Sequence, residues 1–328
     1  MNLEPTIETD FISGEPFRLA SGEILPSVKQ HYAIYGELNA DKSNSVLVFH
    51  ALTGSARIAD WWADLIGDIS TALDVSRFAF ICVNALGSCY GSTGAGEITS
   101  IVTTKDIVRA QKLLFEHLGI EKFQAVIGSS LGGMMALQFA ADFPGAVKRC
   151  ISIGASPLSA MGLALNHLQR AAIRYENGVS LARQIAIISY KSKELFDARF
   201  ARKPNRNGEN PTESFENRFD VAGYLDYQGE KLTERFDPKT YNLLSKAMDL
   251  FDLTDEEIRQ ITAKVSFVGI SSDWLFPASD ILNLAEKMKS LGVDAEYFEI
   301  VSDDGHDAFL SDAEKTSEIL KQVVSAKR

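Results

Sequence analysis

The chain has 328 residues, of which 45% are hydrophobic and 23% are charged, the balance of a globular protein with a large core. Its 44 acidic and 33 basic residues give a formal net charge of −11, which argues against broad binding to nucleic acid or to an anionic membrane. Three cysteines are too few for a disulfide framework, and neither a signal peptide nor a membrane-spanning apolar run is evident. These features predict a cytoplasmic protein.

Short segments rich in Val, Ile and Phe are predicted as strands. Most are apolar throughout, which is typical of parallel strands buried on both faces. Helices are predicted between them, at 103–119, 131–144 and 279–292, and alternating strands and helices indicate an α/β fold with a mostly parallel central sheet. The predicted strands are 28–36, 45–51, 78–85, 123–130, 147–156, 263–273 and 295–302.

The alternation stops between residues 157 and 262. This stretch contains helical patterns at 159–175, 180–200 and 240–253, and a polar loop at 203–218. We therefore predict a helical cap, residues 157–262, inserted into a core that is formed by residues 1–156 and 263–328.

A candidate nucleophile lies between a predicted strand and a predicted helix, in Gly128-Ser-Ser130-Leu-Gly132. This is the context of the G-x-S-x-G nucleophile elbow, in which glycines allow a tight turn that projects the serine. Ser130 fits the motif, whereas Ser129 has Ile127 two residues upstream instead of glycine. An ordinary glycine-rich turn is the alternative interpretation.

A serine hydroxyl needs a base, and the chain has five histidines. His306 follows the last predicted strand, where an open sheet would present a base to the elbow. Asp273 ends the preceding strand and would orient the base, with Asp280 as the alternative; the order Ser130, Asp273, His306 is that of α/β hydrolases. We interpret the other four histidines as structural: they are His31, His50, His117 and His167.

Acyl transfer also requires donors for the oxyanion of the tetrahedral intermediate. We expect the backbone N–H groups of Leu131 and Leu52, the latter in the loop after strand 45–51, with His50 holding this loop. The sequence shows no spacing of metal ligands. Four cations between Arg199 and Arg206 form either a solvated face of the cap or an anion site.

With these residues the chain resembles the homoserine O-acetyltransferase family of α/β-hydrolase-fold acyltransferases. Similar segments span nearly the whole chain: Tyr32–Asn39, His50–Ser55, Asp60–Gly67, Asn84–Gly94, Ser130–Met134, Tyr224, Gln228–Gly229, Arg235–Asp237, Ala247–Asp249, Ser272–Pro277 and Gly305–Phe309.

The resemblance implies ping-pong transfer in methionine biosynthesis, with acetyl-CoA as co-substrate, no permanently bound cofactor, and a homodimer formed through cap helices. It also implies that Arg199 holds the acceptor's carboxylate, that Asp307 meets its ammonium, and that Tyr224 lines the pocket. The family's Arg-Phe-Gly-Arg is Arg199-Phe-Ala-Arg202 here, and its Gly-Pro is Gly94-Ala95. These departures leave open serine as acceptor, succinyl-CoA as donor, or water as acceptor in an esterase.

Overall fold

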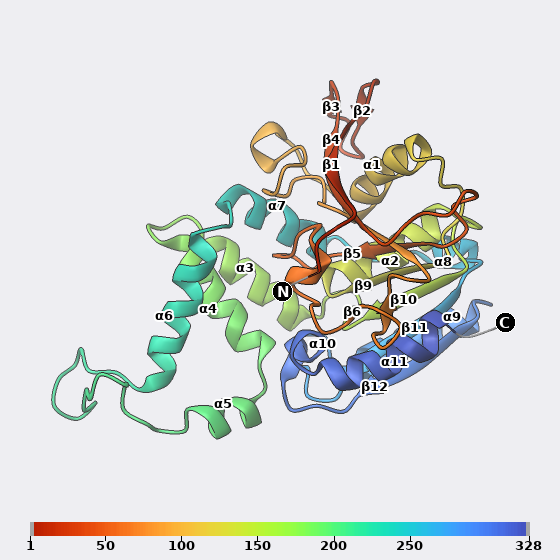
Figure 1. The fold of residues 1–328 in the computed structure, drawn as a ribbon. Coiled ribbons are helices and arrows are strands. Elements are labelled where there is room, and N and C mark those ends of the chain that lie inside the picture. The colour runs from red at the N-terminus through yellow and green to blue at the C-terminus, as the bar shows by residue number, and fades with distance from the viewer. Residues whose placement is uncertain (1–2, 326–328) are drawn as a thin grey trace.

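The computed structural model describes residues 3–325, and an eight-stranded sheet runs through it (Figure 1). Strand β4 pairs antiparallel with β1 and β8, whereas the other neighbouring strands are parallel. The predicted α/β fold with a mostly parallel sheet is therefore confirmed. In spatial order the strands are β1 (Ile7–Ile12), β4 (Lys29–Tyr35), β8 (Ala79–Val83), β5 (Ser45–Phe49), β9 (Ala125–Ser129), β10 (Arg149–Ile153), β11 (Lys264–Ile270) and β12 (Ala295–Ile300).

The central strands are buried on both faces, as their continuous apolar runs predict. All residues of β5 are buried; Leu47 and Phe49 pack into one core, and Val46 and Val48 pack into the other. Because successive side chains of a strand point to opposite faces, two hydrophobic layers sandwich the sheet. Two short strand pairs lie outside it: β2 (Phe17–Arg18) with β3 (Ile24–Leu25), and β6 (Ile66–Gly67) with β7 (Leu73–Asp74).

Helices cover both faces of the sheet. The three predicted helices form and contribute to one core, which contains Leu114, Met134 and Met288. Helix α11 contributes Leu320 and Val323 to the opposite core. The helices around the sheet are α1 (Thr104–His117), α2 (Leu131–Asp142), α8 (Asp255–Gln260), α9 (Ala278–Ser290), α10 (Ala308–Ser311) and α11 (Ala313–Ser325), with 3-10 turns η1 (Ile58–Asp60), η2 (Ala95–Glu97) and η3 (Gly305–Asp307).

Five helices between β10 and α8 extend to one side of the sheet, where Figure 1 shows α3, α4 and α6 packed together. The helical pattern at 180–200 forms two helices, because Ser192 begins a new one by accepting the Leu195 N–H at 3.0 Å. The five are α3 (Ala160–Ala172), α4 (Gly178–Tyr190), α5 (Lys193–Arg199), α6 (Asp220–Thr233) and α7 (Pro238–Asp249).

The boundaries of the cap at residues 157 and 262 stay a prediction. Helix α8 lies inside that range but packs against α2 of the sheet layer, and Lys105 of α1 pairs with Glu257 of α8 at 2.8 Å. None of the helices within residues 3–325 combines the length and apolarity that crossing a bilayer requires.

Candidate active site

Ser130 lies on a sharp turn between β9 and α2. Its backbone has φ 56° and ψ −126°, a left-handed conformation that non-glycine residues rarely adopt. The Ser130 N–H donates to the Ile153 carbonyl oxygen of neighbouring β10 at 2.8 Å, and the Ser130 carbonyl oxygen accepts the Met134 N–H at 3.1 Å. These bonds hold the strained residue in place, with 6% of its surface exposed.

Two glycines make this turn possible. A Cβ at Gly128 would lie 2.0 Å from the Gly132 carbonyl oxygen, and a Cβ at Gly132 would lie 2.2 Å from the Phe49 carbonyl oxygen at the end of β5. Any side chain at these positions would force α2 away from the sheet. The close packing brings the first amide of α2 beside the loop that follows β5.

His306 and Asp273 form a buried pair. The His306 Nδ1 lies 2.6 Å from Asp273 Oδ2, and both side chains are at most 3% exposed. The other Asp273 oxygen, Oδ1, accepts the N–H groups of Leu275 and Phe276, each at 2.9 Å. Because the ionised carboxylate can only accept, Nδ1 carries the proton and the far nitrogen, Nε2, is left as a base.

The surroundings of His306 adjust its basicity. Burial opposes protonation of the imidazole, but the Asp273 carboxylate, helped by Asp307, outweighs it, so the pKa of His306 is raised above its usual value. Aromatic rings surround the imidazole, with centroids at 5.6 Å for Tyr190, 5.2 Å for Phe276 and 5.4 Å for Phe309. Such a shell fixes the orientation of the ring.

The end of β10 brings Ser130 and His306 together. Ser130 is bonded to Ile153, and a Cβ at the next residue, Gly154, would lie 3.3 Å from His306 Cε1. The buried His306 Nε2 has no hydrogen-bond partner within residues 3–325, so no hydrogen bond joins it to Ser130 Oγ. The base is thus close to the elbow and its accepting nitrogen is free.

The expected oxyanion donors belong to the two segments that pack together at the elbow, the start of α2 and the loop after β5. Leu131 is the first residue of α2 and Leu52 follows β5; neither N–H has an acceptor among the described residues. His50 shapes the second loop: its Nε2 accepts the Ala85 N–H at 3.0 Å, so its Nδ1 donates to the Ala51 carbonyl oxygen at 2.8 Å. Full burial lowers the pKa of His50, which keeps it neutral in this structural role.

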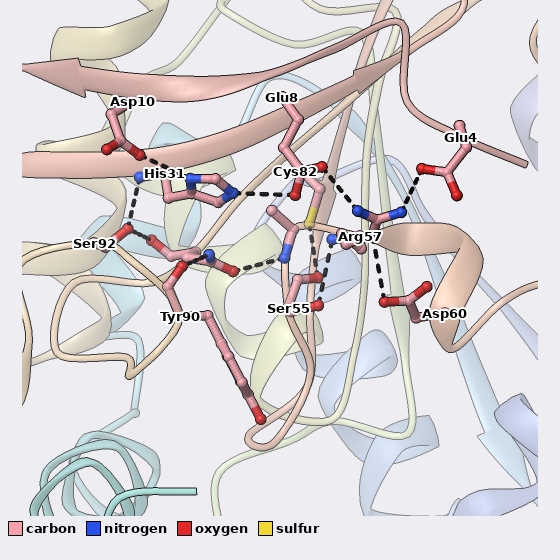
Figure 2. Close-up of polar contacts among 12 residues, drawn as sticks. Glu4, Glu8, Asp10, His31, Ser55, Arg57, Asp60, Cys82, Tyr90 and Ser92 are labelled. Atoms are coloured by element: carbon pink, nitrogen blue, oxygen red, sulfur yellow. Dashed lines mark hydrogen bonds and ion pairs between the residues drawn. The ribbon is translucent and has the colours of Figure 1, made fainter. Parts of the chain in front are cut away.

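His31 is bound elsewhere, as Figure 2 shows. Its Nδ1 lies 2.7 Å from Asp10 and its Nε2 lies 3.2 Å from Glu8, both on β1. The neighbouring Arg57 pairs with Glu8 at 2.9 Å and also with Glu4. Both nitrogens of His31 are therefore engaged in attaching β1 to the sheet, and neither contacts Ser130.

The structure places Arg199 and Tyr224 together but apart from the triad. The Arg199 guanidinium lies 4.5 Å from the centroid of the Tyr224 ring, and both residues line a cavity of about 460 Å³ between α5 and α6. Neither the triad nor Asp307 lines this cavity. Ala201, where the family has glycine, has φ 47°, a conformation that glycine would adopt without strain.

Asp307 has a partner that the sequence did not indicate. Its Oδ2 lies 2.9 Å from Lys191 Nζ, at the junction of α4 and α5. The helical pattern at 180–200 did not locate this junction, although Ser192 followed by Glu194 is a signal for a helix start. Within residues 3–325, no three His, Cys, Asp or Glu side chains are grouped so as to hold a metal ion.

Comparison with known proteins gives the family and the fold of the chain. Residues 44–313 match the model of the alpha/beta hydrolase fold family. The chain is 37% identical to a homoserine O-acetyltransferase of Geotalea uraniireducens over 90% of each chain. The structure resembles a homoserine O-acetyltransferase from Bacillus anthracis (TM-score 0.88, 22% identity, 98% of each chain) and esterase E22 (TM-score 0.86, 22% identity, 97% of this chain and 100% of the other). At this identity the two structures show the fold alone.

Proposed function

This chain belongs to the homoserine O-acetyltransferase family, within the α/β-hydrolase fold, and we propose that it transfers the acetyl group of acetyl-CoA to the hydroxyl of L-homoserine in methionine biosynthesis. The observation that carries the proposal is the buried Asp273–His306 pair, in which His306 Nε2 is free and the imidazole packs against Gly154, the residue after the Ile153 carbonyl that holds the strained Ser130. These groups have the arrangement that nucleophilic acyl transfer requires.

In the first half-reaction Ser130 becomes acetylated. Its Oγ gives a proton to His306 Nε2 and attacks the thioester carbonyl, and the N–H groups of Leu52 and Leu131 stabilise the oxyanion. Asp273 stabilises the resulting imidazolium. The tetrahedral intermediate then expels the CoA thiolate, which takes the proton from Nε2 and leaves as the free thiol.

In the second half-reaction the acceptor takes the acetyl group. The homoserine hydroxyl gives its proton to His306 Nε2 and attacks the acyl-serine, and Ser130 Oγ regains the proton as the ester product leaves. From the family resemblance, Arg199 would hold the acceptor's carboxylate, with Tyr224 beside it, and Asp307 would meet the ammonium. Because Arg199 and Tyr224 line a cavity that does not include the triad, this arrangement requires α5 to move toward His306 when the acceptor binds. In support, Arg199 contacts aromatic rings and has no carboxylate partner among the described residues.

The test is a matrix of donors and acceptors. Release of the CoA thiol is followed for acetyl-CoA and succinyl-CoA, each without acceptor, with L-homoserine and with L-serine. With acetyl-CoA as donor, we expect homoserine to accelerate the release of the CoA thiol strongly. If p-nitrophenyl acetate is hydrolysed rapidly while homoserine accelerates nothing, the protein is an esterase and the proposal is wrong.

We also propose a cytoplasmic homodimer. Three free thiols, Cys82, Cys89 and Cys150, are typical of a reducing compartment. Exposed apolar side chains on α3 and α4 support an interface between cap helices: Met161, Leu168, Leu181 and Ile188. Light scattering at micromolar concentration should give twice the mass of one chain, and a single-chain mass would contradict the dimer.

A further inference from the structure

The junction between α4 and α5, residues 190–192, lies directly against the turn that carries His306. Trp274 donates its indole N–H to the Lys191 carbonyl oxygen at 3.2 Å. A Cβ at Gly305 would lie 2.6 Å from the Tyr190 carbonyl oxygen, and the Ser192 hydroxyl donates to the turn's backbone. The backbone of Lys191 is therefore fixed beside the base.

The side chain of Lys191 is directed at one partner, Asp307. Its Nζ lies 2.9 Å from Asp307 Oδ2, and the two side chains are 14% and 17% exposed. Within residues 3–325 this is the only ion pair of either group. Since most of the surrounding water is excluded, the pair is stronger than one on the open surface.

We infer that Lys191 occupies, in the acceptor-free enzyme, the place at Asp307 that the acceptor's ammonium takes during turnover. This inference rests on the proposed function. A hydroxyl that reaches His306 Nε2 brings the rest of a small amino acid close to Asp307, the next residue in the chain. The primary ammonium of Lys191 and that of an amino acid make the same charge-assisted hydrogen bond to this carboxylate.

The exchange makes Lys191 a specificity-determining residue. An acceptor with an amino group can displace Lys191 and leave Asp307 paired, so the Asp307 carboxylate is not left uncompensated in a largely buried site. An acceptor without an amino group leaves the Lys191–Asp307 pair intact and gains nothing from Asp307. The pair therefore sets the affinity for amino-acid acceptors, and it acts on the acetylation of Ser130 only through the charges that face His306.

The test compares Lys191→Met with Lys191→Arg. In Lys191→Met the internal competitor is gone, and we expect the KM for L-homoserine to fall about five- to tenfold, the effect of removing one ion pair of this burial. The KM for 4-hydroxybutanoate, the same hydroxy acid without the amino group, should stay within about twofold because Asp307 gives it no contact. Lys191→Arg, which can hold Asp307 through two hydrogen bonds, should raise the KM for homoserine.

The matched control is Lys193→Met, which removes an exposed lysine two residues away that pairs with Asp197 on α5. Lys193→Met should leave the KM for homoserine and the KM for 4-hydroxybutanoate unchanged. In an Asp307→Asn background, Lys191→Met should have no further effect on the KM for homoserine, because the two changes remove the same interaction.

A second readout needs no acceptor. The charged groups that face His306 are Asp273, Asp307 and Lys191, and the Lys191 cation opposes protonation of the imidazole. In Lys191→Met the acidic limb of the pH–rate profile for p-nitrophenyl acetate hydrolysis should move to higher pH, and in Lys193→Met it should not. A lysine whose charge does not reach His306, as expected for Lys193, would not move this limb.

The outcomes separate the two proposals. If homoserine accelerates thiol release in the unaltered protein, yet Lys191→Met leaves its KM unchanged or raises it, the role of Lys191 is refuted and the proposed function stands. If homoserine accelerates nothing in the unaltered protein, both proposals fall together. A lowered KM in Lys191→Met but not in Lys193→Met, with 4-hydroxybutanoate unaffected, supports the exchange.

Discussion

Replacing Asp273 by Asn should abolish most activity without disturbing the fold. In this protein Asp273 Oδ1 accepts two backbone N–H groups at 2.9 Å, and Oδ2 contacts His306 Nδ1 at 2.6 Å. In Asp273→Asn the amide oxygen must face the two N–H donors, because the amide nitrogen could not accept their hydrogen bonds. The amide NH2 group then points at the imidazole.

The consequence is a change of tautomer. A donor opposite Nδ1 turns that nitrogen into an acceptor, so the proton of His306 moves to Nε2. Nε2 then has no lone pair with which to take the proton of Ser130. In a serine protease the same substitution lowers kcat about 10⁴-fold, and we expect a similar loss here, equivalent to about 5 kcal/mol of transition-state stabilisation.

The assay is release of the CoA thiol from acetyl-CoA in the presence of homoserine, at saturating concentrations of both. Asp280→Asn, which changes the alternative acid in the first turn of α9, is the matched control and should retain normal turnover. Thermal unfolding of both variants checks the fold. A loss of less than about tenfold in a folded Asp273→Asn protein would refute the assigned role of Asp273.

Three further predictions concern the base, the oxyanion loop and α5. The pKa of His306 is raised and its neutral form is the base, so kcat/KM should increase with pH, with an apparent pKa above the ordinary histidine value of about 6.5. An apparent pKa at or below that value would contradict the proposed effect of Asp273 and Asp307 on His306. His50→Gln, which loosens the loop of Leu52, should lower kcat about 10- to 100-fold with little change in the KM for acetyl-CoA, and an unchanged kcat would exclude His50 from supporting the oxyanion site. Ala201→Gly relieves a φ of 47° and should increase the free energy of unfolding in urea by about 0.5–1 kcal/mol; a decrease would show that Ala201 is unstrained.

Much of the fold follows from local patterns. The continuous apolar runs predict the parallel strands, because only burial on both faces tolerates them. The elbow is also predictable, since glycines at 128 and 132 are required by contacts within a few residues and with β5. The N-terminal strand β1 is not predictable in this way. Its three charged or polar side chains, Glu8, Thr9 and Asp10, give no apolar run, and the strand forms through pairing with β4 and with His31, which only the folded chain brings together.

The contacts of the site depend on elements that are distant in sequence. The aspartate at 273 and the histidine at 306 can be proposed from their places after strands, but the ion pair between Lys191 and Asp307 cannot. It exists because α4 ends at Tyr190 and its last residues meet the turn at Gly305. No spacing in the sequence links residues 191 and 307, and only the packing of helices above the sheet brings them together.

The central claim is that Ser130 carries the acetyl group during turnover. The most direct measurement is mass spectrometry of the intact protein and of its peptides, after acetyl-CoA is added without acceptor and the reaction is stopped with acid. The account predicts an added acetyl mass on the peptide that contains Ser130, lost when homoserine is supplied before the acid, and absent from Ser130→Ala. Acetylation of another residue, or thiol release to homoserine by Ser130→Ala at the normal rate, would contradict the account.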